Sequence, residues 1–120
     1  MKRDMDLARG ILLSVEAEDN GKARVFEREH EDASTIHHVK LLLGAGLLER
    51  VGAVPSNERF KVHLSWDGHD FLDAVRDDGI WNKTQEQVAE TGGSAEREVV
   101  KALAIGFMKQ KISHHTGFEL

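Results

Sequence analysis

The sequence predicts an α+β fold that is mainly helical, and three patterns support this prediction. First, Leu7, Ile11 and Val15 recur at helical spacing and make one apolar face near the N-terminus. Second, residues 59–64 alternate polar and apolar side chains, which is typical of a strand with one buried face. Third, Gly46 directly follows a helical pattern, at the position where a glycine in the left-handed conformation commonly ends a helix.

Composition limits the classes of protein to which the chain can belong. Its 120 residues predict a single domain, and its net charge of −5 at pH 7 argues against strong non-specific affinity for nucleic acid. The absence of cysteine excludes disulfides, thiolate zinc sites and cysteine nucleophiles. No apolar run has the length of a membrane span or the form of a signal peptide, so we expect a cytoplasmic protein with no membrane partner.

The first part of the chain predicts a helix, a short strand and an acidic segment. The helix begins after Asp4 or Asp6, whose carboxylates can cap exposed backbone N–H groups. A strand is predicted over residues 22–26. Residues 27–32 then form a solvated loop or a first helical turn, because they include no apolar side chain.

The central helix, residues 34–45, organises the rest of the prediction. Asp32 or Ser34 caps it, and apolar residues at helical spacing give it an inner face. The inner face comprises Ile36, Val39, Leu42 and Leu43, and the outer face comprises Ser34, His37, His38, Leu41 and Ala45.

A hairpin and another helix follow the central helix. Residues 47–51 and 59–64 are predicted as two strands joined by the loop of residues 52–58, which holds the only proline. Ser65 is a good N-cap for a helix over residues 66–77.

Residues 1–90 are predicted to form one domain, which a further helical pattern over residues 80–88 completes. Residues 91–120 then comprise a glycine linker, a helix over residues 95–111 and a loose tail. Helix, strand, helix, hairpin and helix, in this order, are the layout of a winged helix. The predicted fold is therefore a winged helix-turn-helix-like domain with a small antiparallel hairpin and a C-terminal helical extension.

Several segments together resemble a known family. They are Met1–Leu7, His38–Leu42, Leu64–Ala74, Arg76–Asp78 and Ile80–Lys83. They look like a bacterial and prophage family catalogued as domain of unknown function 2513, and the resemblance covers most of the chain. It implies a winged-helix-like fold and a phage or prophage setting, and it supplies no catalytic residues.

The predicted fold points first to a DNA-binding regulator of phage or prophage type. A recognition helix places polar side chains from its N-terminal half in the major groove, and cations of the wing can contact phosphates. The candidate contacts are Arg28, Ser34, Thr35, His37, His38, Lys40, Arg50, Arg59 and Lys61. We expect double-stranded DNA as the partner, with no enzymatic activity and no cofactor.

An acidic protein-interaction module that has lost DNA binding is the competing hypothesis. The central helix has no arginine, asparagine or glutamine, the residues that favour base readout. The four acids among residues 27–32 would also repel phosphates. Leu41 on the outer face suits a contact with a protein. Such a module would bind a host or phage protein, including a defence component.

The sequence gives little support to other chemistries. His69 could act as a base with Asp70 or Asp73 as its partner, and Asp73 lies four residues along the predicted helix. No nucleophile accompanies these residues, so we expect structural roles. The histidines lack the spacing of a zinc site, and no metal site is predicted. Phe71 is expected in the core, and Trp66 and Trp81 in the core or at an interface.

The C-terminal helix gives the strongest signal for self-association. Its apolar band comprises Val99, Val100, Leu103, Phe107 and Met108. A helix that follows a glycine linker must bury such a band somewhere. We expect a homodimer formed through this helix, and the alternative is packing onto its own domain.

Overall fold

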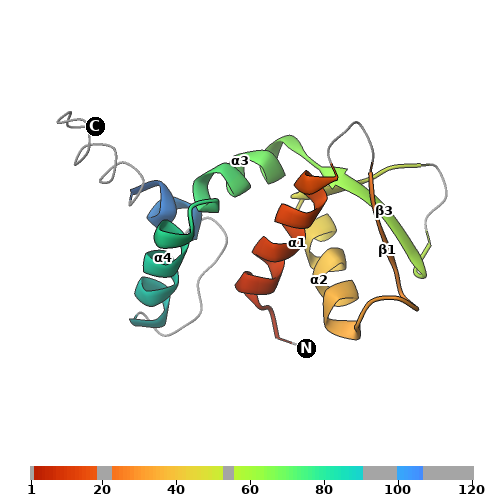
Figure 1. Ribbon diagram of the computed structural model, residues 1–120, viewed down its shortest axis with the longest axis horizontal. Helices are drawn as coiled ribbons and strands as arrows, with labels where there is room; N and C mark the ends of the chain where they lie inside the picture. The colour runs from red at the N-terminus through yellow and green to blue at the C-terminus, as the bar shows by residue number, and fades with distance from the viewer. Residues whose placement is uncertain (1, 19–22, 53–55, 91–99, 107–120) are drawn as a thin grey trace. The chain divides into compact units, whose positions relative to one another are not determined.

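The structure is a computed structural model, and it describes residues 2–18, 23–52, 56–90 and 100–106 (Figure 1). The fold is α+β and mainly helical, as the sequence predicts. The chain divides into two compact units, Met1–Leu72 and Asp73–Leu120. This division falls inside a helix rather than between residues 90 and 91.

The first unit contains two helices, a three-stranded sheet and most of a third helix. These elements are α1 (Met5–Ala17), β1 (Arg24–Glu27), α2 (Ala33–Gly44), β2 (Leu48–Arg50), β3 (Arg59–Leu64) and α3 (Trp66–Val75). The strand order is β1-β3-β2 with both pairings antiparallel, so the predicted hairpin of β2 and β3 is confirmed and β1 adds a third strand. The helices α1 and α2 contact each other and pack against the sheet (Figure 1).

The register of the sheet sorts its side chains onto two faces. Phe26 lies opposite Phe60, Leu48 lies opposite Leu64, and all four are buried. The alternate residues of β3 are exposed on the other face, as the sequence predicts. One face of the sheet therefore forms the core with α1 and α2, and the other face is open to solvent.

Each of the first two helices begins at an aspartate that caps it. The Asp4 carboxylate accepts hydrogen bonds from the N–H groups of Asp6 and Leu7 at 3.0 and 3.2 Å. The Asp32 carboxylate accepts the Thr35 N–H at 2.7 Å. Both caps are among the alternatives that the sequence offers, and they fix where the two helices start.

The chain reaches α2 through a turn rather than through another helix. The N–H groups of His30 and Glu31 both donate to the Glu27 carbonyl, at 3.0 and 3.1 Å. A helix-turn-helix uses a helix at this position, and the residues between β1 and α2, all of which are described, contain none. The order of elements otherwise matches the predicted layout, and the winged-helix assignment stays a prediction.

Two glycines allow the end of α2 to contact the start of α3. Gly46 has a φ of 78°, the left-handed conformation that the sequence predicts. The Ser65 hydroxyl donates to the Gly46 carbonyl and accepts the Gly68 N–H at 2.9 Å, so it caps α3 and ties it to the end of α2. A Cβ on Gly68 would overlap the Leu47 carbonyl oxygen, which makes glycine necessary at this contact.

The second unit contains the end of α3, the helix α4 (Asp78–Glu90) and a helical segment over residues 100–106. Trp81 is 3% exposed and therefore lies in the core of this unit. The other buried residues are Ala74, Val75, Ile80, Thr84, Val88, Val100 and Ala104.

The predicted dimer interface lies partly in this unit. Val100 is 1% exposed, so its side chain is already covered by its own chain, and Leu103 is half-buried. The other three predicted residues, Val99, Phe107 and Met108, lie outside the described residues, as do the glycine linker and the tail. Burial of Val100 favours the alternative of packing within the chain for this one residue.

Candidate interaction surfaces

Four of the side chains predicted to contact DNA lie on α2 and are at least partly accessible. Lys40 is exposed, whereas Ser34, Thr35 and His37 are half-buried. Leu41, which follows Lys40, is 37% exposed. The helix therefore presents a cation beside a large apolar side chain, a mixture that suits a protein contact as well as a phosphate backbone.

His38 is buried, which corrects its predicted position on the outer face of this helix. Only 1% of the residue is exposed. Its Nε2 lies 2.8 Å from the backbone N of Asp4 and its Nδ1 lies 2.7 Å from the Ser34 carbonyl. An N–H group can only donate, so Nε2 accepts from Asp4 and the hydrogen on Nδ1 is donated to Ser34. His38 ties the start of α1 to α2 and is not available to DNA.

Two of the predicted DNA contacts, Arg28 before the reading helix and Arg50 of the wing, brace the loop between β2 and β3. The Arg28 Nε donates to the Asn57 carbonyl at 2.8 Å. The Arg50 Nη2 donates to the Ser56 carbonyl at 2.9 Å, and its guanidinium carbon lies 4.6 Å from the centroid of the Phe60 ring. Both guanidinium groups are therefore held by the chain itself.

A groove on the exposed face of the sheet collects the remaining predicted wing cations. Its volume is about 700 Å³. It is lined by Val15, Glu16, Ala23, Val25, Val51, Arg59, Lys61, His63, Leu64 and His69. The size falls within the range of small-molecule sites, and the lining mixes apolar side chains with cations and imidazoles.

Part of the positive charge in this groove is balanced by neighbouring acids. The Arg59 Nε lies 3.5 Å from the Glu27 carboxylate, and the His63 Nε2 lies 3.6 Å from the Glu49 carboxylate. Lys61 differs, because its partner across the β1–β3 pairing is Val25 and no described residue forms an ion pair with it. Lys61 is therefore the uncompensated cation of the groove.

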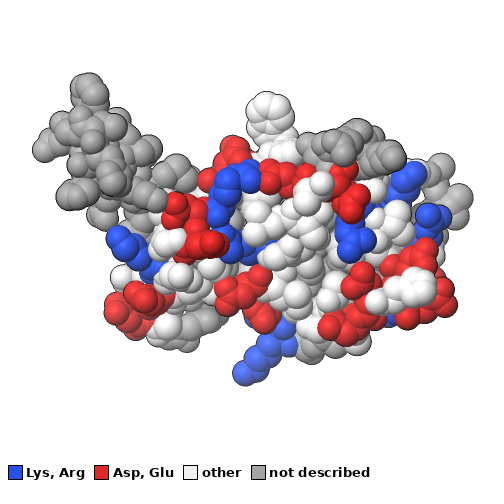
Figure 2. Space-filling model, viewed as in Figure 1, with Lys and Arg blue, Asp and Glu red and all other residues white. Residues whose placement is uncertain are grey.

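The cations of the sheet do not join α2 in one positive surface. Phe60 and Val62, which flank Lys61 in β3, are buried in the core, so Lys61 projects from the face that α1 and α2 leave open. On the face that Figure 2 shows, the described basic side chains are interspersed with acidic ones and form no continuous basic area. The predicted DNA contacts are thus divided between two sides of the first unit.

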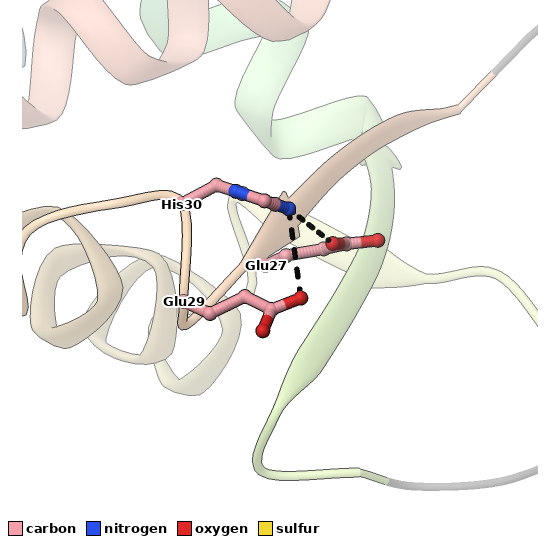
Figure 3. A group of neighbouring side chains, drawn as sticks. All are labelled: Glu27, Glu29 and His30. Atoms are coloured by element: carbon pink, nitrogen blue, oxygen red, sulfur yellow. Dashed lines mark ion pairs between the residues drawn. The ribbon is translucent and has the colours of Figure 1, made fainter.

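The turn between β1 and α2 holds a cluster of two carboxylates and an imidazole (Figure 3). The His30 Nε2 lies 3.2 Å from Glu27 Oε2 and 3.5 Å from Glu29 Oε1. One ligand atom of each residue lies within 4.8 Å of the others, a spacing at which they can hold a cation after small adjustments. The His30 side chain is 69% exposed and that of Glu29 78%, so water screens the cluster strongly.

The N-cap residue of α2, Asp32, places a negative charge at the start of this helix. The hydrogen bond from the Thr35 backbone N–H, with a second from the Thr35 side chain, holds the pKa of the Asp32 carboxyl below its ordinary value. The charge also lies at the N-terminus of a helix, where the helix dipole favours an anion. A carboxylate therefore occupies the place where a phosphate would approach the predicted reading helix.

Trp66, the first residue of α3, lies outside the core. It is 84% exposed, whereas Phe71 on the same helix is 1% exposed and occupies the predicted core position. Asp67 and Asp70 are exposed next to it, Asp70 one helical turn along, and α3 contains no lysine or arginine. We call Trp66, Asp67 and Asp70 the α3 entry surface.

The exposure of Trp66 can be predicted from its position in the helix, although its hydrophobicity alone would predict burial. Trp66 lies four and seven residues before Asp70 and Asp73, so it belongs to the polar side of the helix rather than to the side of Phe71 and Leu72. The helical period therefore predicts exposure where residue type predicts burial.

His69 and Asp73, the pair considered for catalysis, lie in separate environments. The Asp73 Oδ1 accepts a hydrogen bond from the Arg76 Nη2 at 2.8 Å. His69 is exposed and lines the groove on the sheet. The lining of that groove includes no serine, threonine or cysteine, so the groove itself supplies none of the usual nucleophiles.

Within the described residues, no helix has the length and apolar character needed to cross a membrane.

Comparison with known proteins places the chain in a family. No solved structure matches the chain significantly. A protein of Haemophilus influenzae (strain Rd), named "Uncharacterized protein", is 30% identical over 118 residues, which cover 94% of this chain and 100% of that protein. The family model described as "Hypothetical protein (DUF2513)" matches residues 2–94, and the chain therefore belongs to this family.

Proposed function

We propose that the chain is a non-enzymatic interaction module that acts in the cytoplasm and binds a partner protein through the α3 entry surface. The observation that carries this proposal is the 84% exposure of Trp66. Tryptophan is enriched among the residues that contribute most to protein–protein affinity. An exposed indole also leaves a large apolar area in water, which a partner can cover.

The core of the first unit does not need Trp66. Phe60, Phe71 and Leu72 are each at most 1% exposed, so the core is closed by other side chains. Exposure of the indole is therefore a property of its position in the helix and not the result of poor packing. A residue that contributes nothing to the core is free to serve binding.

The backbone below Trp66 is held firmly before any partner arrives. The Ser65 hydroxyl bonds both to the Gly46 carbonyl and to the Gly68 N–H, which fixes the first turn of α3. Gly68 also packs directly against the Leu47 carbonyl. A preorganised anchor loses less conformational entropy when a partner binds.

DNA binding by a winged-helix regulator of phage type is the second candidate, and the groove on the sheet favours it. Arg59 and Lys61, both predicted contacts, line this groove, and Lys40 is exposed on α2. Contacts between these cations and phosphates would release counterions, so affinity would fall steeply with salt. We rank this candidate second because Glu27 and Glu49 already balance part of the charge.

We also propose a homodimer formed through the C-terminal helix, on the strength of its apolar band. Leu103 is half-buried in a single chain, so it retains surface that a second copy could cover. Light scattering at micromolar concentration tests this part of the proposal, and a monomer mass would contradict it.

A parallel binding experiment distinguishes the two candidate functions. The full chain, Trp66→Ala and Leu41→Ala are immobilised and exposed to the same bacterial lysate. We expect a retained protein that the Trp66 variant loses and the Leu41 variant keeps. The same chains, with Lys61→Glu, are titrated with a labelled DNA duplex from about 50 to about 200 mM salt. A duplex shift that Lys61→Glu removes, without any Trp66-dependent protein, would reverse the ranking.

A further inference from the structure

We infer that the α3 entry surface recognises a cationic segment, with an arginine that stacks on Trp66 and pairs with Asp67. This inference rests on the proposed protein-binding function, and it names the chemistry of the partner. It follows from the exposed ring, from the carboxylates beside it and from the lack of an ion pair at Asp67 among the described residues.

The ring of Trp66 is open to a stacking cation. Among the described residues, guanidinium groups lie over aromatic rings at two places, Arg24 at 4.5 Å from the Phe26 centroid and Arg50 at 4.6 Å from the Phe60 centroid. Trp66 has no such cation of its own among the described residues. Tryptophan binds cations more strongly than phenylalanine does, so the ring best suited to this contact is the one left open.

The carboxylates beside the ring favour the same ligand. Asp67 and Asp70 are exposed within one turn of Trp66, and Asp67 forms no ion pair with a described residue. A guanidinium over the indole can reach a neighbouring carboxylate, which adds a charge-assisted hydrogen bond to the stacking contact. The net charge of −5 would further increase the rate at which a cationic partner associates.

Other occupants fit this surface less well. A nucleic acid or an acidic segment would be repelled by the two aspartates. A purely apolar helix would remove both carboxylates from water without offering them a partner. A second copy in a symmetric contact would bring its own Trp66, Asp67 and Asp70 against the same residues, which places like charges together.

Peptide binding to the full chain tests the inference. A fluorescein-labelled peptide of alternating arginine and glycine is titrated and followed by anisotropy, beside matched peptides with lysine and with glutamate. We expect the arginine peptide to bind most tightly, the lysine peptide more weakly and the glutamate peptide not at all. Trp66→Leu, which keeps an apolar side chain and removes the ring, should weaken binding by about fivefold or more. Trp66→Phe should retain most of the affinity.

A paired charge variant provides the second test. Asp67→Asn with Asp70→Asn should weaken binding by about fivefold at low salt, and the loss should shrink as salt rises. The control replaces two exposed acids of α4, Glu86→Gln with Glu90→Gln, and should bind as the parent chain does. All these side chains are exposed, so circular dichroism should show unchanged folding.

The outcomes separate this inference from the proposed function. Equal binding by the parent chain, Trp66→Leu and the double aspartate variant would overturn the inference, and so would equal binding of the glutamate peptide. If a lysate protein depends on Trp66 but excess arginine peptide does not displace it, the protein-binding function stands and the cationic assignment is wrong. If no lysate protein depends on Trp66, the function itself fails.

Discussion

The helices α2 and α3 each contain one residue whose environment is the reverse of what its side chain suggests. In α2 the polar His38 is 1% exposed, and in α3 the apolar Trp66 is 84% exposed. His38 is buried because the Asp4 N–H and the Ser34 carbonyl satisfy both of its ring nitrogens. Trp66 is exposed because the packing of α3 turns its other side toward the core.

The difference between the two helices shows which residues serve the fold and which are free to serve a partner. A polar side chain with all its hydrogen-bonding groups satisfied inside the protein has no capacity left for a ligand. An apolar side chain held on the surface keeps its whole binding capacity. The candidate site therefore lies at the start of α3 rather than on α2, where the sequence placed it.

The largest effect expected from α2 and α3 comes from Gly68, the glycine that lets α3 approach α2. Gly68→Ala should lower the free energy of unfolding by about 3 kcal/mol, because its Cβ would overlap the rigid carbonyl of Leu47. Urea denaturation followed by circular dichroism measures the change. The matched control is Gly10→Ala, where no atom lies within 4 Å of the added Cβ; it should raise stability by about 0.5–1 kcal/mol. Equal effects of the two variants would show that the contact with Leu47 is not tight.

The next largest effect should come from the buried histidine. His38→Leu should cost about 2–3 kcal/mol, because the Asp4 N–H loses its acceptor at the start of α1. His37→Leu, at the half-buried neighbouring position, should change stability by less than about 0.5 kcal/mol. Urea midpoints of the two variants compare them directly. If both variants behaved alike, His38 would not be the link between α1 and α2, and its candidacy for DNA binding would return.

Sequence periodicity predicted most of the fold, because caps and alternation act locally. Asp4, Ser65 and Gly46 each adopt the role that their residue type predicts, and β3 shows the predicted alternation. A strand was predicted near β1, but its pairing with β3 was not, because more than thirty residues of chain separate the two strands. Such long-range pairing depends on tertiary packing, which a local pattern does not contain.

The candidate site could be predicted only in part, and for physical reasons. Arg59 and Lys61 face solvent as alternation requires, but the ion pair between Arg59 and Glu27 arises from strand register. The burial of His38 depends on Asp4, thirty-four residues away, so no local pattern reveals it. The exposure of Trp66, by contrast, follows from a local pattern, because the helical period places it on the polar side of α3.

A smaller effect on the free energy of unfolding, which depends on pH, is expected at Asp32, the residue that caps α2. The Asp32 carboxyl has a pKa below its ordinary value because the Thr35 N–H and side chain bond to its charged form. Its contribution to stability is therefore complete above the unfolded-state pKa and is lost as the pH falls through the lower, folded-state value. Asp32→Asn keeps an acceptor for the cap but does not titrate. The urea midpoint of the parent chain should exceed that of Asp32→Asn at neutral pH, and the two midpoints should converge at acidic pH. A difference that stays constant with pH would contradict this role for Asp32.

The smallest effect on stability is expected at Trp66, where the effect on binding should be large. Trp66→Ala removes a side chain that is 84% exposed, so the free energy of unfolding should change by less than about 0.5 kcal/mol. Trp81→Ala, at a residue that is 3% exposed, removes the same group from a core and should cost about 3–5 kcal/mol. A loss of stability at Trp66 close to that at Trp81 would mean that the indole packs against its own chain. Unchanged stability together with lost partner binding would instead show that Trp66 serves recognition alone, because the fold would not depend on its side chain.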